Sequence, residues 1–298
     1  MITESQYRHL GASGIKVSPI GTGTNKWWQG KNDETVFQTF HSLIDVGVNF
    51  FDTAEVYSFG KSESLLGDCL KRDPRPVVIG TKFAPYPTRL LRRQFMSALD
   101  ASLKRLNRQV LDLYYLHFPS PLPSIETVMD MMAEAVESGK IRAVGVSNFS
   151  ADQMIEAADR LEKYDVPLAV NEVHYSLFHR QPEVNGVLDA CRKLNVALVA
   201  YRPLEGSRLA VSPTSRRGKT ASKEEAIQET LQTIAQQRGK SVSQVTLNWM
   251  LRRDEHVIPI PGSTHVNHAL DNVDALSWRL SDDEFTAIDK VSSPIQPS

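Results

Sequence analysis

The sequence has little of what marks a secreted, membrane-spanning or nucleic-acid-binding protein. Its only two cysteines, Cys69 and Cys191, fit neither a disulfide framework nor the paired spacings of a zinc site. No stretch reaches the roughly 18 uninterrupted apolar residues of a membrane-spanning helix, and the N-terminal segment has no apolar run of the secretory kind. Lys and Arg total 34 against 35 Asp and Glu, which leaves no basic surplus for nucleic acid. We therefore expect a cytoplasmic protein without nucleic-acid or membrane partners.

Several ligand-binding motifs are also missing. The sequence contains no G-x-G-x-x-G fingerprint, no Walker A sequence and no H-E-x-x-H. These absences count against Rossmann and P-loop nucleotide sites and against a zinc protease, and we expect no metal site. Nothing in the sequence indicates a linker between domains or an oligomeric state.

What the sequence does contain is a regular alternation of short apolar runs and amphipathic stretches. The runs at 111–117 and 197–201 are apolar on both faces, which is typical of parallel strands covered by helices. Eight such repeats in about 250 residues favour an α/β fold, a single-domain (β/α)8 TIM barrel over residues 1–298, above a six-stranded open sheet. Strands are expected at 19–23, 48–53, 77–82, 111–117, 143–147, 169–173, 197–201 and 257–260. Helices are expected at 34–45, 62–71, 88–106, 124–138, 151–161, 183–194, 223–237 and 266–276.

Two segments fall outside the repeat. Residues 7–17, with Gly11 and Gly14 at the turn, predict an N-terminal hairpin that plugs the lower mouth of the barrel. Residues 281–291, which open with Ser281 and Asp282, predict an extra C-terminal helix.

Ionisable residues end three successive predicted strands. Asp52 ends the second strand, Lys82 the third and His117 the fourth, and Tyr57 follows Asp52 by five residues. Because the carboxyl ends of barrel strands share one rim, these side chains are expected to converge. A tyrosine has a pKa near 10, and a neighbouring ammonium favours its phenolate, so Lys82 would make Tyr57 a better acid. Taken singly, each residue also has an ordinary structural interpretation. Asp52 can be a turn residue, Lys82 a surface cation, His117 a core histidine and Tyr57 a packed ring.

The sequence resembles one known family over nearly its whole length. The segments NFFDTAEVYSFGKSESLLG, IGTKF, LYYLHFP, IRAVGVSNF and AYRPL resemble, in order, the motifs of the aldo-keto reductases, which are NAD(P)H-dependent (β/α)8 enzymes. The resemblance implies reduction of a small aldehyde or ketone by hydride transfer. It implies Tyr57 as the general acid, Lys82 and Asp52 as the residues that tune it, and His117 as the group that orients the carbonyl.

The same resemblance implies a site for NADPH, with NAD as the other possibility. Ser147 and Asn148 match the pair that binds the nicotinamide carboxamide, and Tyr201 matches the ring that stacks on it. Independently, free N–H groups at the predicted helix start after Gly262 would attract a phosphate. The full expected cofactor site comprises Gly23, Thr24, Asp52, Ser147, Asn148, Glu172, Tyr201, Arg202, Pro203, Leu204, Gly206, Ile260, Gly262, Ser263, Thr264, His268 and Asn272.

Four positions depart from the family pattern. Glu172 stands where many members have a glutamine that completes the carboxamide contacts, and Arg202 where many have serine. Gly262 and His268 stand where better-known branches have the Lys and Arg that hold the 2′-phosphate. The preference between NADPH and NADH is therefore open.

The substrate is expected against Trp27, Trp28, Tyr57 and His117. With other aromatic residues near the rim, the two tryptophans would favour an apolar or aromatic aldehyde. Two other functions stay open: a non-catalytic, cofactor-sensing regulatory partner of another protein, and, with less support, a metal-dependent barrel hydrolase.

Overall fold

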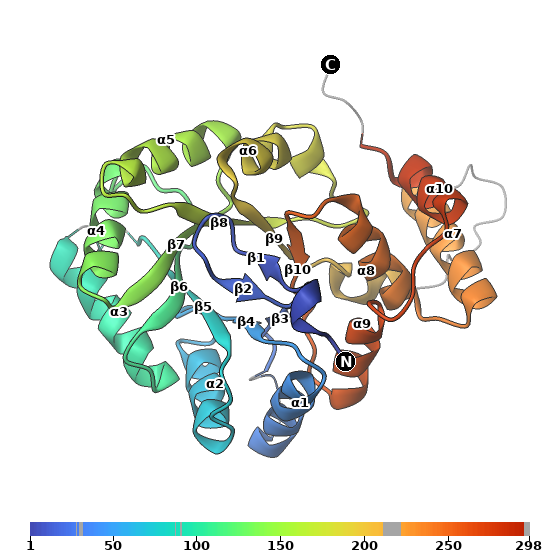
Figure 1. Ribbon diagram of the computed structural model, residues 1–298, viewed down its shortest axis with the longest axis horizontal. Helices are drawn as coiled ribbons and strands as arrows, with labels where there is room; N and C mark the ends of the chain where they lie inside the picture. Colours follow the sequence, from blue (N-terminus) through green and yellow to red (C-terminus); the bar gives the residue numbers. More distant parts are fainter. Residues whose placement is uncertain (28, 30–31, 87, 90, 211–221, 295–298) are drawn as a thin grey trace.

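Eight parallel strands form a nearly closed barrel surrounded by helices (Figure 1). The computed structural model describes residues 1–27, 29, 32–86, 88–89, 91–210 and 222–294. Neighbouring strands pair in chain order from first to last, and an isolated bridge between Gly23 and Gly262 closes the seam. The barrel prediction is thus confirmed, and the open sheet is wrong. The strands are β3 Thr22–Gly23, β4 Phe50–Asp52, β5 Val78–Phe83, β6 Leu111–Leu116, β7 Ile141–Ser147, β8 Leu168–His174, β9 Ala197–Tyr201 and β10 Val257–Pro259.

The helices largely follow the predicted ranges. Among the described residues, no helix combines the length and the apolar character needed to cross a membrane. The helices are α1 Asp33–Asp45, α2 Lys61–Arg72, α3 Arg92–Leu106, α4 Ile125–Glu137, α5 Ala151–Glu162, α6 Val187–Leu194, α7 Lys223–Arg238, α8 Val242–Arg253, α9 Val266–Asp274 and α10 Asp282–Ser292. Short 3-10 turns lie at η1 Glu4–Gln6, η2 Gln181–Glu183 and η3 Glu205–Ala210.

One helix was not predicted. Helix α8 follows α7 after three residues, and it is capped by Ser241, whose side chain accepts a hydrogen bond from the backbone N–H of Gln244. It is α8 that packs against β10, whereas α7 packs against the C-terminal α10 outside the barrel ring (Figure 1). The predicted seventh barrel helix at 223–237 is therefore an outer helix.

The three predicted starts that differ most from the structure were all too early. The first barrel strand shortens to Thr22–Gly23, although the N–H of Gly21 still donates to the carbonyl oxygen of Pro259 at 3.0 Å. The helix expected from 183 begins at Val187, because Gly186 has a positive φ of 84° just before it. The helix expected from 88 begins at Arg92.

The N-terminal hairpin covers the end of the barrel where the strands begin. Strands β1 Arg8–His9 and β2 Lys16–Val17 pair antiparallel. Leu10, Ile15 and Val17 are buried in one cluster with residues from the barrel interior. Figure 1 shows the hairpin across the centre of the barrel. The predicted hairpin is present, and it closes this mouth with apolar side chains.

The hairpin turn lies close to the barrel, and this predicts that alanine substitutions at Gly11 and Gly14 lower stability by different amounts. A Cβ on Gly11 would lie 2.5 Å from the carbonyl oxygen of Asn195 and 2.7 Å from that of Ala169, whereas one on Gly14 would meet no atom of the described residues within 4 Å. Both residues have positive φ, so an alanine carries backbone strain at either position. We expect Gly11→Ala to lower the free energy of unfolding by about 1–3 kcal/mol more than Gly14→Ala in urea titrations. Equal losses would show that the hairpin does not press on the barrel.

Candidate active site

Four side chains expected from the sequence meet at the carboxyl end of the strands. Asp52 ends β4, Lys82 lies in β5, and Tyr57 and His117 follow β4 and β6. Lys82 Nζ donates to Asp52 Oδ2 at 2.5 Å and to the carbonyl oxygen of Thr53 at 2.8 Å. The same nitrogen lies 5.3 Å from the centre of the Tyr57 ring. The rings of Tyr57 and His117 meet edge to face, 6.0 Å between centres.

A fifth side chain joins this group from another strand. Glu172 lies in β8, and its Oε2 is 3.1 Å from Lys82 Nζ. Lys82 and both of its carboxylate neighbours are almost completely buried. From the sequence we placed Glu172 at the cofactor and missed its contact with the lysine. The available signal was a lone acid within the apolar run LAVNEVH.

The surroundings decide the charges in this cluster. Burial by itself would lower the pKa of Lys82, but Asp52 and Glu172 raise it above its usual value, so the lysine is a cation at neutral pH. Burial raises the pKa of Tyr57, and the charge of Lys82 offsets only part of that rise. The phenol therefore keeps its proton at neutral pH and lies beside a fixed positive charge.

His117 is neutral in the same cluster. Burial, together with the charge of Lys82, lowers its pKa to about 3. Its Nδ1 is buried and has no hydrogen-bond partner among the described residues. A neutral imidazole offers one N–H donor and one acceptor, so it can hold a carbonyl oxygen without competing for protons at neutral pH.

Beside these residues, Tyr201 forms the end of a stack of three rings. Its ring lies against His174 at 5.4 Å and 12°, and His174 lies against His179 at 4.2 Å and 7°. The Tyr201 hydroxyl donates to Asn148 Oδ1 at 2.9 Å, and Asn148 Nδ2 donates to Ser147 Oγ at 3.0 Å. Among the described residues, His174 is the only ring that stacks on Tyr201. The tyrosine and the amide thus form one hydrogen-bonded platform.

Glu205 stabilises this platform by contacting His174, the ring that stacks on Tyr201, and Ser176. Its Oε1 accepts from Ser176 Oγ at 2.6 Å and lies 2.7 Å from His174 Nε2. Glu205 and Arg202 both have positive φ, at 51° and 52°, which is unusual for residues with a side chain. The strained turn between them carries Pro203 and Leu204, which belong to the expected cofactor site, so the His174–Glu205 contact anchors this loop.

The other predicted cofactor residues flank the barrel seam. The seam lies between β10 and β3, and β9 pairs with β10. The loops that follow these three strands therefore lie together at one end of the barrel. Among the described residues, a Cβ on Gly23 would meet only the carbonyl oxygen of Ile260, at 3.2 Å, and a Cβ on Gly206 would meet nothing within 4 Å. Two predicted cofactor residues form hydrogen bonds within the protein: Thr24 Oγ1 donates to the Asp52 carbonyl, and Asn272 Nδ2 donates to Ser263 Oγ. Gly262, Thr264 and His268 lie at or near the surface around the start of α9.

These features fit a nicotinamide cofactor. The platform offers a flat ring with amide and hydroxyl groups beside it, and Gly23 and Gly262 leave backbone uncovered next to it. Helix α9 begins at Val266, and no side chain among the described residues caps it, so its first N–H groups can serve as donors for an anion.

Trp27 is placed differently from the expectation. Trp27 is buried, its ring centre lies 6.3 Å from that of Phe51, and its Nε1 donates to the carbonyl of Ser263 at 2.8 Å. It thereby links the loop after β3 to the loop after β10, which assigns it a packing role. Trp28 lies outside the described residues.

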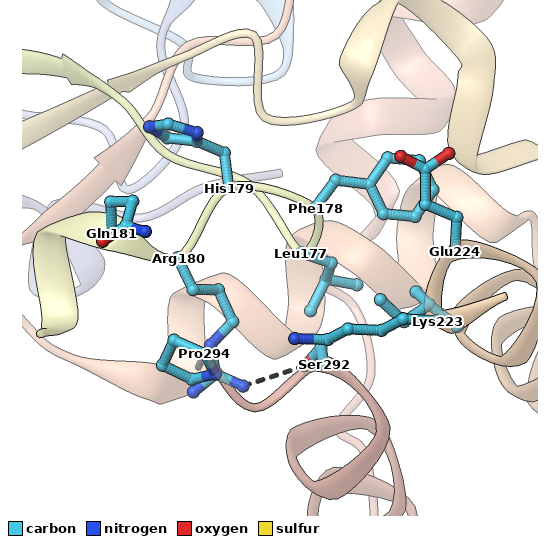
Figure 2. Close-up of a pocket in the computed structure, with 10 residues that line it drawn as sticks. Leu177, Phe178, His179, Arg180, Gln181, Lys223, Glu224, Ser292 and Pro294 are labelled. Atoms are coloured by element: carbon cyan, nitrogen blue, oxygen red, sulfur yellow. Dashed lines mark hydrogen bonds between the residues drawn. The ribbon is translucent and has the colours of Figure 1, made fainter. Parts of the chain in front are cut away.

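A separate cavity of about 350 Å³ lies between the loop after β8, the start of α7 and the end of α10 (Figure 2). Its Arg180 is held by Glu183 at 2.6 Å, by Asp289 at 2.8 Å and by Ser292 at 2.8 Å. The cavity contains none of the predicted site residues. It is lined by Leu177, Phe178, His179, Arg180, Gln181, Lys223, Glu224, Ile227, Ser292 and Pro294.

Comparison with known proteins agrees with this geometry. The model of the Aldo/keto reductase family matches residues 19–293. Pyridoxal reductase, chloroplastic, of Arabidopsis thaliana is 35% identical over 300 residues, covering 91% of this chain and 82% of the relative. The 6-dehydroglucose reductase of Novosphingobium aromaticivorans is 32% identical over 297 residues, covering 95% and 94%.

Two solved structures are similar throughout. A thermostable aldo-keto reductase in complex with the inhibitor epalrestat has a TM-score of 0.83 and 31% identity, covering 96% of this chain and 99% of that chain. An aldo/keto reductase from Klebsiella pneumoniae in complex with NADP and acetate has a TM-score of 0.81 and 27% identity, covering 99% and 98%. With its eight-stranded barrel and the lysine, tyrosine and histidine gathered at the strand ends, the chain belongs to the aldo/keto reductase family.

Proposed function

We propose that the protein reduces a small aldehyde or ketone to an alcohol with NADPH, with Tyr57 as the proton donor. The observation that carries the proposal is the buried Lys82 cation beside the neutral Tyr57 phenol, with neutral His117 at the edge of the same ring. The names of the relatives support the class of reaction, because both describe reductases. One further relative, from Schizosaccharomyces pombe, carries NADP(+) in its name.

Each residue has one task in the proposed reaction. When bound, the nicotinamide supplies the hydride that the carbonyl carbon accepts. His117 donates an N–H to the carbonyl oxygen and orients it toward Tyr57. The Tyr57 hydroxyl gives its proton to that oxygen as negative charge develops there, and Lys82 stabilises the phenolate left behind. Asp52 holds Lys82 in place, and water returns the proton to Tyr57.

The cofactor residues divide into two groups. Tyr201, Ser147 and Asn148 would hold the nicotinamide, and the strained turn after Tyr201 and the start of α9 would hold the phosphates. We propose NADPH as the cofactor, with NAD still possible because Gly262 and His268 supply no fixed cation at the usual 2′-phosphate positions. The cytoplasmic location stays a prediction; Cys69 and Cys191 are free, buried thiols.

The exposed aromatic residues of the rim bear on the substrate. Phe59, two residues after Tyr57, is fully exposed, and Tyr86 and Phe118 are partly exposed in the loops after β5 and β6. Phe83, in contrast, is buried. We therefore propose an apolar or aromatic aldehyde, bound against Tyr57 and His117, as the preferred substrate class.

Cofactor titration and turnover test this proposal. NADPH should quench the tryptophan fluorescence saturably, because Trp27 contacts the Ser263 carbonyl beside the expected phosphate site. NADPH should also bind more tightly than NADH. With aromatic aldehydes in excess, each protein molecule should oxidise many NADPH molecules. Tight NADPH binding with negligible turnover would instead favour the cofactor-sensing partner. Tighter binding of NADH would reverse the proposed cofactor preference.

A further inference from the structure

Lys82 lies between two buried carboxyl groups. Asp52 Oδ2 is 2.5 Å from its Nζ and Glu172 Oε2 is 3.1 Å from it. If all three groups were ionised, the cluster would carry a net charge of −1 in a place that water does not reach. Burying an uncompensated charge is costly, so one proton shared by the two carboxyls is the favourable state.

The hydrogen-bonding pattern shows where that proton is needed. Asp52 Oδ1 and Glu172 Oε2 are both buried, and neither has a hydrogen-bond partner among the described residues. The contact between Glu172 and Lys82 is thus an ion pair at short distance that lacks the angles of a hydrogen bond. A proton on Glu172, the carboxyl with the longer contact to the lysine, lets it donate to Asp52. Burial raises the pKa of Asp52 above its usual value, and the charge of Lys82, followed by the hydrogen bond with Glu172, offsets part of that rise. Burial, followed by the charge of Asp52, raises the pKa of Glu172 to about 8.

The state of Glu172 affects Tyr57 through the lysine. With Glu172 neutral, Lys82 balances one carboxylate and its field stabilises the phenolate of Tyr57. With Glu172 ionised, two carboxylates draw on one ammonium, and the added negative charge raises the pKa of Tyr57 further. The acid is then weaker and its phenolate less stable.

We propose that Glu172 is a positioning residue for the acid step: by holding one proton against Asp52 it leaves Lys82 to act on Tyr57, and its ionisation sets the upper pH limit of reduction. This inference rests on the proposed reductase function. The titratable groups around Glu172 are Asp52 on β4, Tyr57 after it, Lys82 on β5, Tyr115 on β6 and Tyr201 on β9. The tyrosines and the lysine keep their protons up to high pH, and His117 titrates only near pH 3.

The pH profile of reduction tests the proposal. For the wild-type protein, kcat/KM for an aldehyde with NADPH should be level below about pH 8 and fall about tenfold per pH unit above it. Glu172→Gln keeps the shape of the side chain without its titration, so its profile should stay level, within about twofold, to pH 9. Identical falls in both proteins would overturn the inference.

Glu63→Gln is the matched control. Glu63 is equally buried, but it pairs with Thr81 and Arg105 and does not contact Lys82. Its profile should match that of the wild type, and a lost fall in this variant as well would overturn the assignment to Glu172. Absence of turnover by the wild-type protein at every pH would overturn the proposed function itself, whereas normal turnover with unchanged profiles overturns only the role of Glu172.

Thermal unfolding of the cofactor-free protein gives a readout independent of activity. Because folding raises the pKa of Glu172, stability from this group is fully present at pH values below the unfolded pKa and is lost as pH rises through about 8. The Tm of Glu172→Gln relative to wild type should therefore increase between pH 5 and pH 9. A constant difference would show that no proton is shared, and the inference would be wrong.

Discussion

Replacing Tyr57 with phenylalanine should lower kcat for aldehyde reduction by about a thousandfold while the Kd for NADPH changes less than about twofold. The substitution keeps the ring that meets His117 edge to face and removes only the hydroxyl that donates the proton. Steady-state rates, together with fluorescence titration of the cofactor, measure the two effects separately.

Tyr115→Phe is the matched control for this variant. The Tyr115 ring lies at nearly the same distance from Lys82 Nζ, 5.1 Å against 5.3 Å for Tyr57, and its hydroxyl has no hydrogen-bond partner among the described residues. Its removal should change kcat by less than about threefold. If Tyr57→Phe keeps near-wild-type turnover with several aldehydes, the acid has been assigned to the wrong residue.

Lys82→Met should damage both stability and turnover. Removing one partner of a buried ion pair leaves the other uncompensated, and we expect a loss of about 3–5 kcal/mol in the free energy of unfolding at pH 7. Turnover should also fall by at least about a hundredfold, because nothing then stabilises the phenolate of Tyr57. The stability loss should be smaller at pH 5, where Asp52 and Glu172 can be protonated more readily. Urea unfolding at the two pH values measures this.

A second substitution separates the two effects of losing Lys82. Adding Asp52→Asn to Lys82→Met removes a buried charge and should restore part of the stability without restoring turnover. A single Lys82→Met variant as stable as the wild type would contradict the buried ion pair that the structure shows.

The sequence predicted the barrel and the gathering of Asp52, Tyr57, Lys82 and His117, because both depend on the order of strands. A residue at a strand end reaches the rim whatever its distant neighbours are. Helix α8 was missed for a related reason: the repeat assigns one helix to each strand, and α7 had already filled that place. A helix start at Ser241, with Gly239 before it, was the available local signal.

The pairings within the site were less accessible. The contact of Glu172 with Lys82 joins β8 to β5 across the barrel, and the contact of His174 with Glu205 joins two successive repeats. Neither follows from the spacing of residues along one strand. Trp27 was misplaced for the same reason, since its indole N–H binds a carbonyl near the other end of the chain.

The seam of the barrel has a consequence for the growing chain. The first barrel strand, β3, can pair with β4 early in synthesis, but its other edge is joined only after β10 has been made, by the bridge to Gly262 and by hydrogen bonds from Gly21 and Gly23 to the carbonyls of Pro259 and Pro261. Until then the nascent sheet has an open edge, which is a template for pairing with another chain. Since β3 is only two residues long, its unpaired edge offers few backbone groups to a neighbouring polypeptide. The short length of this strand therefore protects the unfinished barrel from aggregation.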